Sequence, residues 1–117
     1  MFVESDRDVA AVLRANIDAL GIANRCHVLV CAAESCAGQL AALAPFDLIL
    51  ADPPYATDLG LRFRRLVADT RILAAHGRFV LEGPSRSAQG TEVAGLRSVH
   101  TAVYGDTRLD FYEPCEP

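Results

Sequence analysis

The sequence of 117 residues contains no lysine, so arginine alone supplies its positively charged side chains, and its net charge is −4. Proteins that hold nucleic acid by its phosphates need clustered basic residues. Arg62, Arg64 and Arg65 form the one such cluster in the sequence, and their pattern is also that of a solvated helix face. If the substrate is nucleic acid, we expect most of the charge that binds it to lie elsewhere.

Long apolar runs and metal-binding patterns are also missing. No stretch approaches the roughly 20 apolar residues of a membrane span, and the first residues do not have the pattern of a signal peptide. The cysteines form neither a Cys-x-x-Cys pair nor a cluster with histidine at zinc spacing; they are Cys26, Cys31, Cys36 and Cys115. We expect a cytoplasmic protein with reduced thiols, no metal and no membrane contact.

Apolar residues make up 51% of the chain and charged residues 22%, a balance typical of a folded domain. Short apolar runs alternate with helical patterns. The patterns predict strands over residues 2–3, 27–31, 46–51 and 78–82, and helices over residues 5–20, 35–44 and 58–67. Ser5 and Asp58 are predicted to cap the first and third helices. The first helix is predicted to end at Gly21, the second at Pro45, and the segment that contains the third helix at Gly77. Because the runs are apolar on both faces, we expect an α/β fold with a parallel sheet covered on each side.

The last part of the chain has a different pattern. Residues 83–95 are rich in glycine, proline, serine and threonine, which predicts a loop. Residues 96–104 and 107–112 then flank Gly105-Asp106, a two-residue turn of the kind that joins the strands of a hairpin. We therefore expect a mostly parallel sheet that ends in an antiparallel hairpin.

The sequence Asp52-Pro53-Pro54-Tyr55, called the 52–55 turn below, directly follows the apolar run 46–51. In open parallel sheets, ligands bind beyond the carboxyl ends of the strands. Two prolines restrict the backbone and lack amide donors, so the Asp52 carboxylate and the Pro53 carbonyl form a rigid pair of acceptors beside the Tyr55 ring. Such acceptors suit methylation of an aromatic amine, whose positive charge grows as the nitrogen attacks a methyl sulfonium.

Further residues connect the chain to a known family. Three segments carry the resemblance: Phe-Val-Glu-Ser-Asp followed by a helix with Asn16, Phe-Asp-Leu-Ile-Leu-Ala before the 52–55 turn, and Tyr-Gly-Asp-Thr-Arg-Leu at residues 104–109. In these segments the chain resembles the bacterial 16S ribosomal RNA guanine-N2 methyltransferases. The resemblance covers nearly the whole chain. It implies a Rossmann-like, S-adenosylmethionine-dependent methyltransferase fold and ribosomal RNA in a small-subunit assembly as partner.

The resemblance also implies roles for particular residues. Asp52, Pro53, Pro54 and Tyr55 match the catalytic turn, and Asp52 also borders the cofactor. Glu4, followed by Ser5, matches the acid that binds the ribose hydroxyls of the cofactor. The family usually has Asp or Asn near residue 32 to bind the adenine amine. This chain has Ala32-Ala33-Glu34 there, so Glu34 or a backbone group such as that of Ala33 is the candidate. Glu82 either borders the base pocket or simply ends a strand.

One departure concerns the start of the family pattern. Its first strand and glycine-rich cofactor loop, and a basic RNA-binding segment, should precede Phe2, so residues 1–117 are expected to be a partial class I methyltransferase domain. The strands at residues 2–3 and 46–51 would then each lack a neighbour, and could pair directly or across a homodimer. Two other functions remain open: an adenine-N6 DNA methyltransferase, since the 52–55 turn is shared with that family, and a non-catalytic truncated module.

Overall fold

The computed structural model describes residues 1–86 and 92–116. The chain divides into two compact units, an amino-terminal unit, Met1–Ala37, and a carboxy-terminal unit, Gly38–Pro117. All four cysteines are free thiols. None of the helices within the described ranges is long and apolar enough to cross a membrane. In the same ranges, no group of three or more His, Cys, Asp or Glu side chains is arranged to hold a metal ion.

In the amino-terminal unit, strands β1 (Phe2–Glu4) and β2 (Val28–Val30) form a two-stranded parallel sheet. The connection contains helix α1 (Arg7–Ala19) and the short 3₁₀ helix η1 (Ala23–Arg25). A second 3₁₀ helix, η2 (Ala33–Ser35), follows β2. The predicted strand–helix–strand order and the stop at Gly21, whose φ is 69°, are confirmed.

The cap of α1 differs from the prediction. Asp6, not Ser5, is the capping residue, and its Oδ1 accepts hydrogen bonds from the amides of Asp8 (2.8 Å) and Val9 (3.1 Å). The chain stays extended through Asp6, with φ −85° and ψ 122°, so the helix begins one residue later than a Ser5 cap requires.

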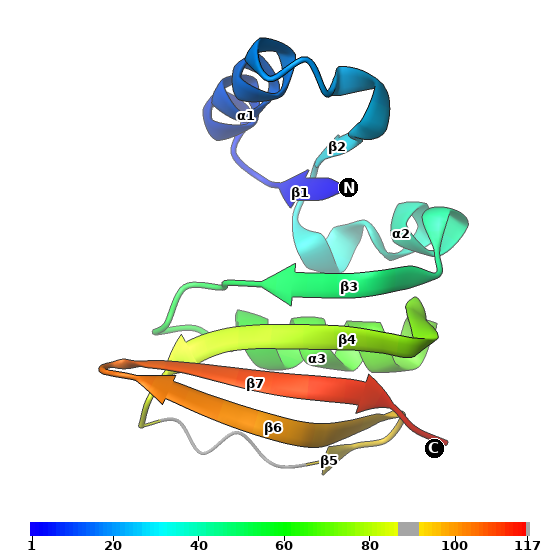
Figure 1. The fold of residues 1–117 in the computed structure, drawn as a ribbon, viewed down its shortest axis with the longest axis vertical. Coiled ribbons are helices and arrows are strands. Elements are labelled where there is room, and N and C mark those ends of the chain that lie inside the picture. The colour runs from blue at the N-terminus through cyan, green and yellow to red at the C-terminus, as the bar shows by residue number, and fades with distance from the viewer. Residues whose placement is uncertain (87–91, 117) are drawn as a thin grey trace. The chain divides into compact units, whose positions relative to one another are not determined.

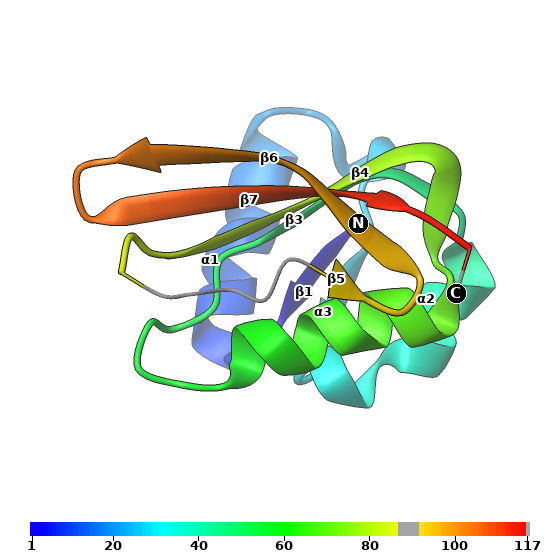
Figure 2. The ribbon, with the colours of Figure 1, turned by 90° about the horizontal axis from the view of Figure 1, so that it is seen from below.

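The carboxy-terminal unit contains a five-stranded sheet in the order β3-β4-β7-β6-β5. Its strands are β3 (Phe46–Ala51), β4 (Leu73–Pro84), β5 (Glu92–Val93), β6 (Leu96–Tyr104) and β7 (Thr107–Pro114). β3 and β4 are parallel, whereas β4–β7, β7–β6 and β6–β5 are antiparallel. Antiparallel pairing therefore extends beyond the predicted hairpin. Helix α2 (Ala37–Leu43) precedes β3, and α3 (Leu59–Thr70) connects β3 to β4 along one face of the sheet (Figure 1); Figure 2 shows that face from the side.

Several predicted boundaries shift. The helix predicted over residues 35–44 begins at Ala37, because residues 33–35 form η2. Gly77 lies inside β4 instead of ending the preceding unit. A Cβ at Gly77 would lie 2.8 Å from Leu73 Cδ1 and 3.0 Å from the Phe46 carbonyl oxygen, beside the irregular register of β3 and β4. Glycine therefore permits close backbone approach here.

The loop predicted over residues 83–95 is shorter than expected. β4 continues to Pro84, and Glu92–Val93 forms β5. Residues 87–91 lie outside the described residues. The hairpin itself is confirmed: β6 and β7 pair from Leu96 with Pro114 to Tyr104 with Thr107. Gly105, at the first turn position, has φ 60°, a left-handed conformation that suits glycine.

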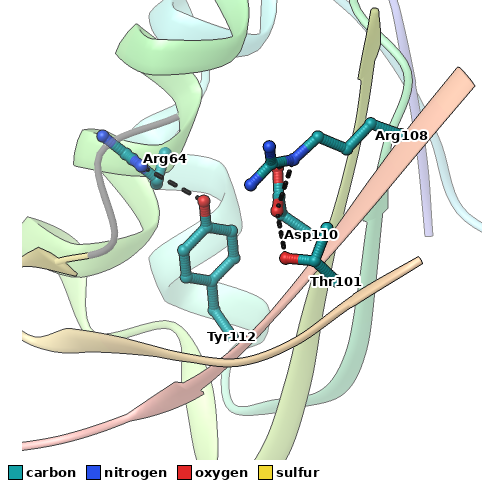
Figure 3. Close-up of polar contacts among 5 residues, drawn as sticks. All are labelled: Arg64, Thr101, Arg108, Asp110 and Tyr112. Atoms are coloured by element: carbon teal, nitrogen blue, oxygen red, sulfur yellow. Dashed lines mark hydrogen bonds and ion pairs between the residues drawn. The ribbon is translucent and has the colours of Figure 1, made fainter. Parts of the chain in front are cut away.

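The core of the carboxy-terminal unit lies between α3 and the sheet. Phe79, Leu81 and Tyr112 are fully buried, and the rings of Phe79 and Tyr112 stack with their centroids 5.6 Å apart. Arg64 was predicted to lie on a solvated face or to contact RNA, but its exposure is 7%. Its Nη1 donates to the Tyr112 hydroxyl at 3.1 Å (Figure 3), and its guanidinium carbon lies 5.7 Å from the centroid of that ring.

A second buried polar group lies on β7. Asp110 Oδ1 accepts hydrogen bonds from Arg108 Nε (2.9 Å) and Thr101 Oγ1 (2.8 Å), as Figure 3 shows. The three residues lie on β6 and β7, and the carboxylate has the charged and polar partners that burial requires. This cluster joins the two strands of the hairpin.

The outer edges of β1 and β3 are unpaired within the described residues, where β1 pairs with β2 and β3 with β4. The direct pairing of the strands at residues 2–3 and 46–51, one of the two expected arrangements, is not seen among the described residues. β3 was also expected to be buried on both faces, which is wrong. Ile49 is buried on the face covered by α3, whereas Leu48 and Leu50 on the other face are 58% and 70% exposed.

The Arg64–Tyr112 contact leads to a stability prediction. Tyr112→Phe keeps the ring stack but removes the hydroxyl that accepts from a buried guanidinium, so we expect the free energy of unfolding to fall by about 1–3 kcal/mol. Urea denaturation followed by fluorescence measures the change. Tyr104→Phe is the matched control, because Tyr104 is 68% exposed. Equal stability of the two variants would contradict the proposed importance of the contact.

Candidate functional site

The 52–55 turn leaves the sheet where β3 ends. Ala51, the last residue of β3, lies opposite Leu81 of β4 in the parallel register. The residues that follow, Asp52 and Glu82, therefore lie at the same edge of the sheet on strands about 4.8 Å apart. Asp52 is exposed. The structure places the predicted catalytic aspartate at the carboxyl edge of a parallel strand pair, as the sequence indicated.

Packing and local hydrogen bonds hold the turn. Pro53 lies against the first turn of α3, where a Cβ added to Gly60 would lie 3.1 Å from Pro53 Cγ. The Thr57 hydroxyl donates to the Pro54 carbonyl (2.9 Å) and accepts from the Leu59 amide (3.4 Å). Asp58 occupies the predicted cap position, but its side chain makes no capping bond. It accepts from Arg62 Nε (2.9 Å) instead.

The two predicted acceptors are available. Among residues 1–86 and 92–116, neither the Asp52 carboxylate nor the Pro53 carbonyl accepts a hydrogen bond. The Pro54 carbonyl, in contrast, is bound by Thr57. The turn thus presents one carboxylate and one carbonyl that could each accept a hydrogen from a ligand amine.

Tyr55 is held by residues from two other strands. Its hydroxyl donates to Glu82 Oε1 (3.1 Å) at the end of β4 and lies 3.2 Å from Thr107 Oγ1 at the start of β7. A tyrosine hydroxyl has a single hydrogen, which is donated to Glu82, so Thr107 donates to Tyr55. The ring, 45% exposed, is therefore anchored at its hydroxyl. Glu82 was expected either to border the base pocket or simply to end a strand. Thr107, which lies directly after the hairpin turn, was not among the predicted site residues.

The residues predicted to bind cofactor lie in the amino-terminal unit. Glu4 ends β1, and its Oε1 accepts from the Asp6 amide (3.1 Å). Its register partner is Val30 at the end of β2, and Ala33 and Glu34 follow shortly in η2. These residues thus lie at the carboxyl ends of the same strand pair, while Ser5 is exposed between β1 and α1. Their participation in one site with Asp52 stays a prediction.

A hollow in the amino-terminal unit is separate from these residues. It has a volume of about 330 Å³ and is lined in part by Arg14, Asp18 and His27. It lies beside the amino end of β2, whereas Glu4 lies at the carboxyl end of β1. None of the predicted cofactor-binding residues lines it.

Near the predicted adenine-binding segment, Cys36 donates a hydrogen bond from its Sγ to the Ala33 carbonyl (3.1 Å). Burial raises the pKa of the Cys36 thiol to about 11, and a hydrogen bond with the Cys31 thiol adds to the increase. A thiol with such a pKa stays protonated at neutral pH. Cys36 therefore acts as a structural donor to the η2 backbone.

Comparisons with known proteins agree with this architecture. A family model described as conserved hypothetical protein 95 matches residues 1–113. No curated protein matches the sequence. A conserved hypothetical protein from Streptococcus pyogenes is similar in structure, with a TM-score of 0.82, 27% identity, and coverage of 94% of this chain and 68% of that one.

Two further structures are similar at lower identity. The candidate methyltransferase yhhF from Escherichia coli has a TM-score of 0.83 and 24% identity, over 98% of this chain and 63% of its own. A candidate methylase from Haemophilus influenzae has a TM-score of 0.77 and 19% identity, over 98% of this chain and 71% of its own. The predicted Rossmann-like methyltransferase fold is confirmed. The chain spans roughly two thirds of the length of these structures.

The raised pKa of Cys36 predicts slow alkylation. At pH 8, a pKa near 11 instead of 9.0 leaves about a hundredfold less thiolate, so iodoacetamide should modify Cys36 far more slowly than the half-buried Cys115. The folded state binds this proton more tightly, so its contribution to stability is present below pH 9 and is lost as the pH rises to about 11. Mass spectrometry of alkylated peptides, with a urea-unfolded control, measures the rates. Equal labelling of Cys36 and Cys115 in the folded protein would disprove the shift.

Proposed function

Since this chain belongs to the methyltransferase family described as conserved hypothetical protein 95, we propose that it transfers a methyl group from S-adenosylmethionine to the N2 amine of a guanine in 16S ribosomal RNA. The observation that carries the proposal is the pair of acceptors in the 52–55 turn. The Asp52 carboxylate and the Pro53 carbonyl have no hydrogen-bond partners in the described residues, and Tyr55, two residues after Pro53, is anchored at its hydroxyl. The family resemblance of the sequence supports guanine and ribosomal RNA as the substrate.

The chemistry follows from the electronic structure of the amine. The lone pair of an exocyclic base amine is delocalised into the ring, so the nitrogen is a weak nucleophile. Hydrogen bonds from its two hydrogens to the Asp52 carboxylate and the Pro53 carbonyl favour a tetrahedral nitrogen. They also stabilise the positive charge that develops during attack. Because that charge is stabilised directly, no base needs to remove a proton before attack.

The base must reach the turn, and Tyr55 is placed to receive it. A base turned out of its stack can be held by stacking on an aromatic ring. When the hydroxyl of that ring is already fixed, little conformational entropy is lost as the ring binds the base. Holding the amine and the methyl donor close together contributes further to the rate enhancement. Asp52 therefore positions and activates the amine, and Tyr55 orients the base.

S-adenosylmethionine would supply the methyl group as a sulfonium. Glu4 fits its ribose: Oε1 accepts from the Asp6 amide, and among the described residues Oε2 has no partner and could accept from a hydroxyl. Ser5 adjoins this acid, and Ala33 and Glu34 lie at the same strand ends, where the adenine would bind.

The partner is ribosomal RNA within a small-subunit assembly, which would place the enzyme in the cytoplasm. The net charge of −4 and the absence of lysine mean that this part of the protein contributes little to phosphate binding. The unpaired edges of β1 and β3 offer positions for a further strand or for a second copy in a homodimer.

The proposal predicts a specific product and a specific dependence. Incubation of the protein with labelled S-adenosylmethionine and undermethylated small ribosomal subunits should yield N2-methylguanosine, identified by mass spectrometry of the nucleosides. Asp52→Ala removes one of the two acceptors, and we expect the rate to fall by about 10²–10³-fold.

Asp47→Ala provides the matched control, because Asp47 is exposed on the same strand at the end away from the turn. Its rate should remain near that of the unmodified protein. Label found in N6-methyladenosine instead would favour an adenine-N6 enzyme. Absence of transfer under these conditions would favour a non-catalytic module.

A further inference from the structure

We propose that Glu82 determines the base specificity of this site by accepting a hydrogen bond from N1–H of guanine. The inference rests on the proposed function and deepens it, because it identifies a side chain that distinguishes guanine from adenine. It is carried by three observations: the register of β3 and β4, in which Ala51 and Leu81 are partners directly before Asp52 and Glu82, the hydrogen bond that holds the Glu82 carboxylate, and an oxygen left available for a ligand.

The position follows from strand register. Ala51 and Leu81 are partners in the parallel pair β3–β4, so Asp52 and Glu82 occupy equivalent positions one residue further on. Burial alternates along β4, with Leu81 and Gly83 buried and Glu82 only half-buried. Glu82 therefore points away from the face packed against α3, on the side where Tyr55 meets it.

The orientation follows from a chain of hydrogen bonds. Thr107 Oγ1 lies 3.2 Å from the Tyr55 hydroxyl, and that hydroxyl donates to Glu82 Oε1 at 3.1 Å. Thr107 donates to the Tyr55 hydroxyl and Tyr55 donates to Glu82, so Glu82 Oε1 already accepts a hydrogen bond. Oε2 has no hydrogen-bond partner among the residues that the structure describes. One carboxylate oxygen is therefore fixed, and the second is available beside the aromatic ring.

The two purines present different edges to such an oxygen. Guanine has an N1–H donor directly next to its N2 amine, so a base whose amine is held by Asp52 can also donate N1–H to a neighbouring carboxylate. Adenine has an unprotonated N1 acceptor next to its N6 amine, and a carboxylate there would repel it. A carboxylate beside the amine-binding acceptors thus favours guanine, by roughly 5- to 150-fold if the contact resembles other direct base contacts.

The experiment compares the binding of three nucleosides to the purified chain by titration, monitored by ¹H–¹⁵N NMR. Guanosine carries N1–H, 1-methylguanosine lacks it, and adenosine has an acceptor at that position. We expect guanosine to bind on the order of tenfold more tightly than the other two. Glu82→Gln should abolish the preference over adenosine, because an amide NH₂ in place of Oε2 donates to adenine N1 and cannot accept from guanine N1–H.

Glu113→Gln is the matched control, because Glu113 lies at the other end of the sheet, where it pairs with Arg78 and Arg97. It should retain the guanosine preference. Thr107→Val provides a second variant that keeps the Glu82 carboxylate but removes the donor that orients Tyr55. It should weaken guanosine binding while guanosine remains preferred over adenosine. NMR spectra of each variant verify folding.

Equal affinities for guanosine and 1-methylguanosine in the unmodified protein would overturn the inference. So would the absence of guanosine-dependent shifts at Glu82, or an unchanged preference in Glu82→Gln. The proposed reaction is tested separately from base recognition. If guanosine is preferred but ribosomal RNA acquires no N2-methylguanosine, recognition of the base by Glu82 is supported and methyl transfer to guanine is contradicted.

Discussion

The candidate site depends on the pairing of β4 with a parallel neighbour on one side and an antiparallel neighbour on the other. The parallel register with β3 brings Asp52 and Glu82 to one edge of the sheet. The antiparallel register with β7 places Thr107 opposite Pro84, so the start of β7 reaches that same edge. Three segments that are far apart in the sequence therefore meet at Tyr55. A slip of one residue in either register would turn Glu82 or Thr107 to the opposite face.

The register is maintained by the core beneath the same strands. Phe79 and Leu81 of β4 and Tyr112 of β7 are fully buried, and Phe79 lies directly opposite Tyr112. Arg64 donates to the Tyr112 hydroxyl from α3, so this hydrogen bond of a buried charge forms only when the helix and the sheet are correctly aligned. Because side chains alternate along a strand, the positions that fill this core also determine that Glu82 faces the other side. The stability of the core and the geometry of the site therefore depend on the same pairing of β4 with β3 and β7.

The sequence predicted those features that depend on short, local patterns. The run at residues 46–51, the 52–55 turn and the hairpin around Gly105 all appear where expected, because proline, glycine and apolar residues act within a few positions. The errors arose where tertiary contacts decide. Gly77 looked like a terminator but permits close packing inside β4, and Arg64 looked exposed but is buried against Tyr112.

The site shows the same division between local and distant effects. Asp52 and Tyr55 could be identified because they are consecutive parts of one recognisable turn. Thr107 could not, because its contact with Tyr55 spans 52 residues and depends on the order of strands in the sheet. Ser5 and Asp6 are both plausible caps, and the choice depends on the backbone conformation at the end of β1, which composition does not reveal.

The central claim is that the 52–55 turn holds the amine of a guanine while Glu82 contacts its N1. A crystal structure of the protein with guanosine monophosphate and S-adenosylhomocysteine tests this most directly. We expect the base to stack on Tyr55, with N2 within hydrogen-bond distance of the Asp52 carboxylate and the Pro53 carbonyl oxygen, and N1 within that distance of Glu82 Oε2. A base bound with its N2 amine directed to solvent, or bound away from the 52–55 turn, would contradict it.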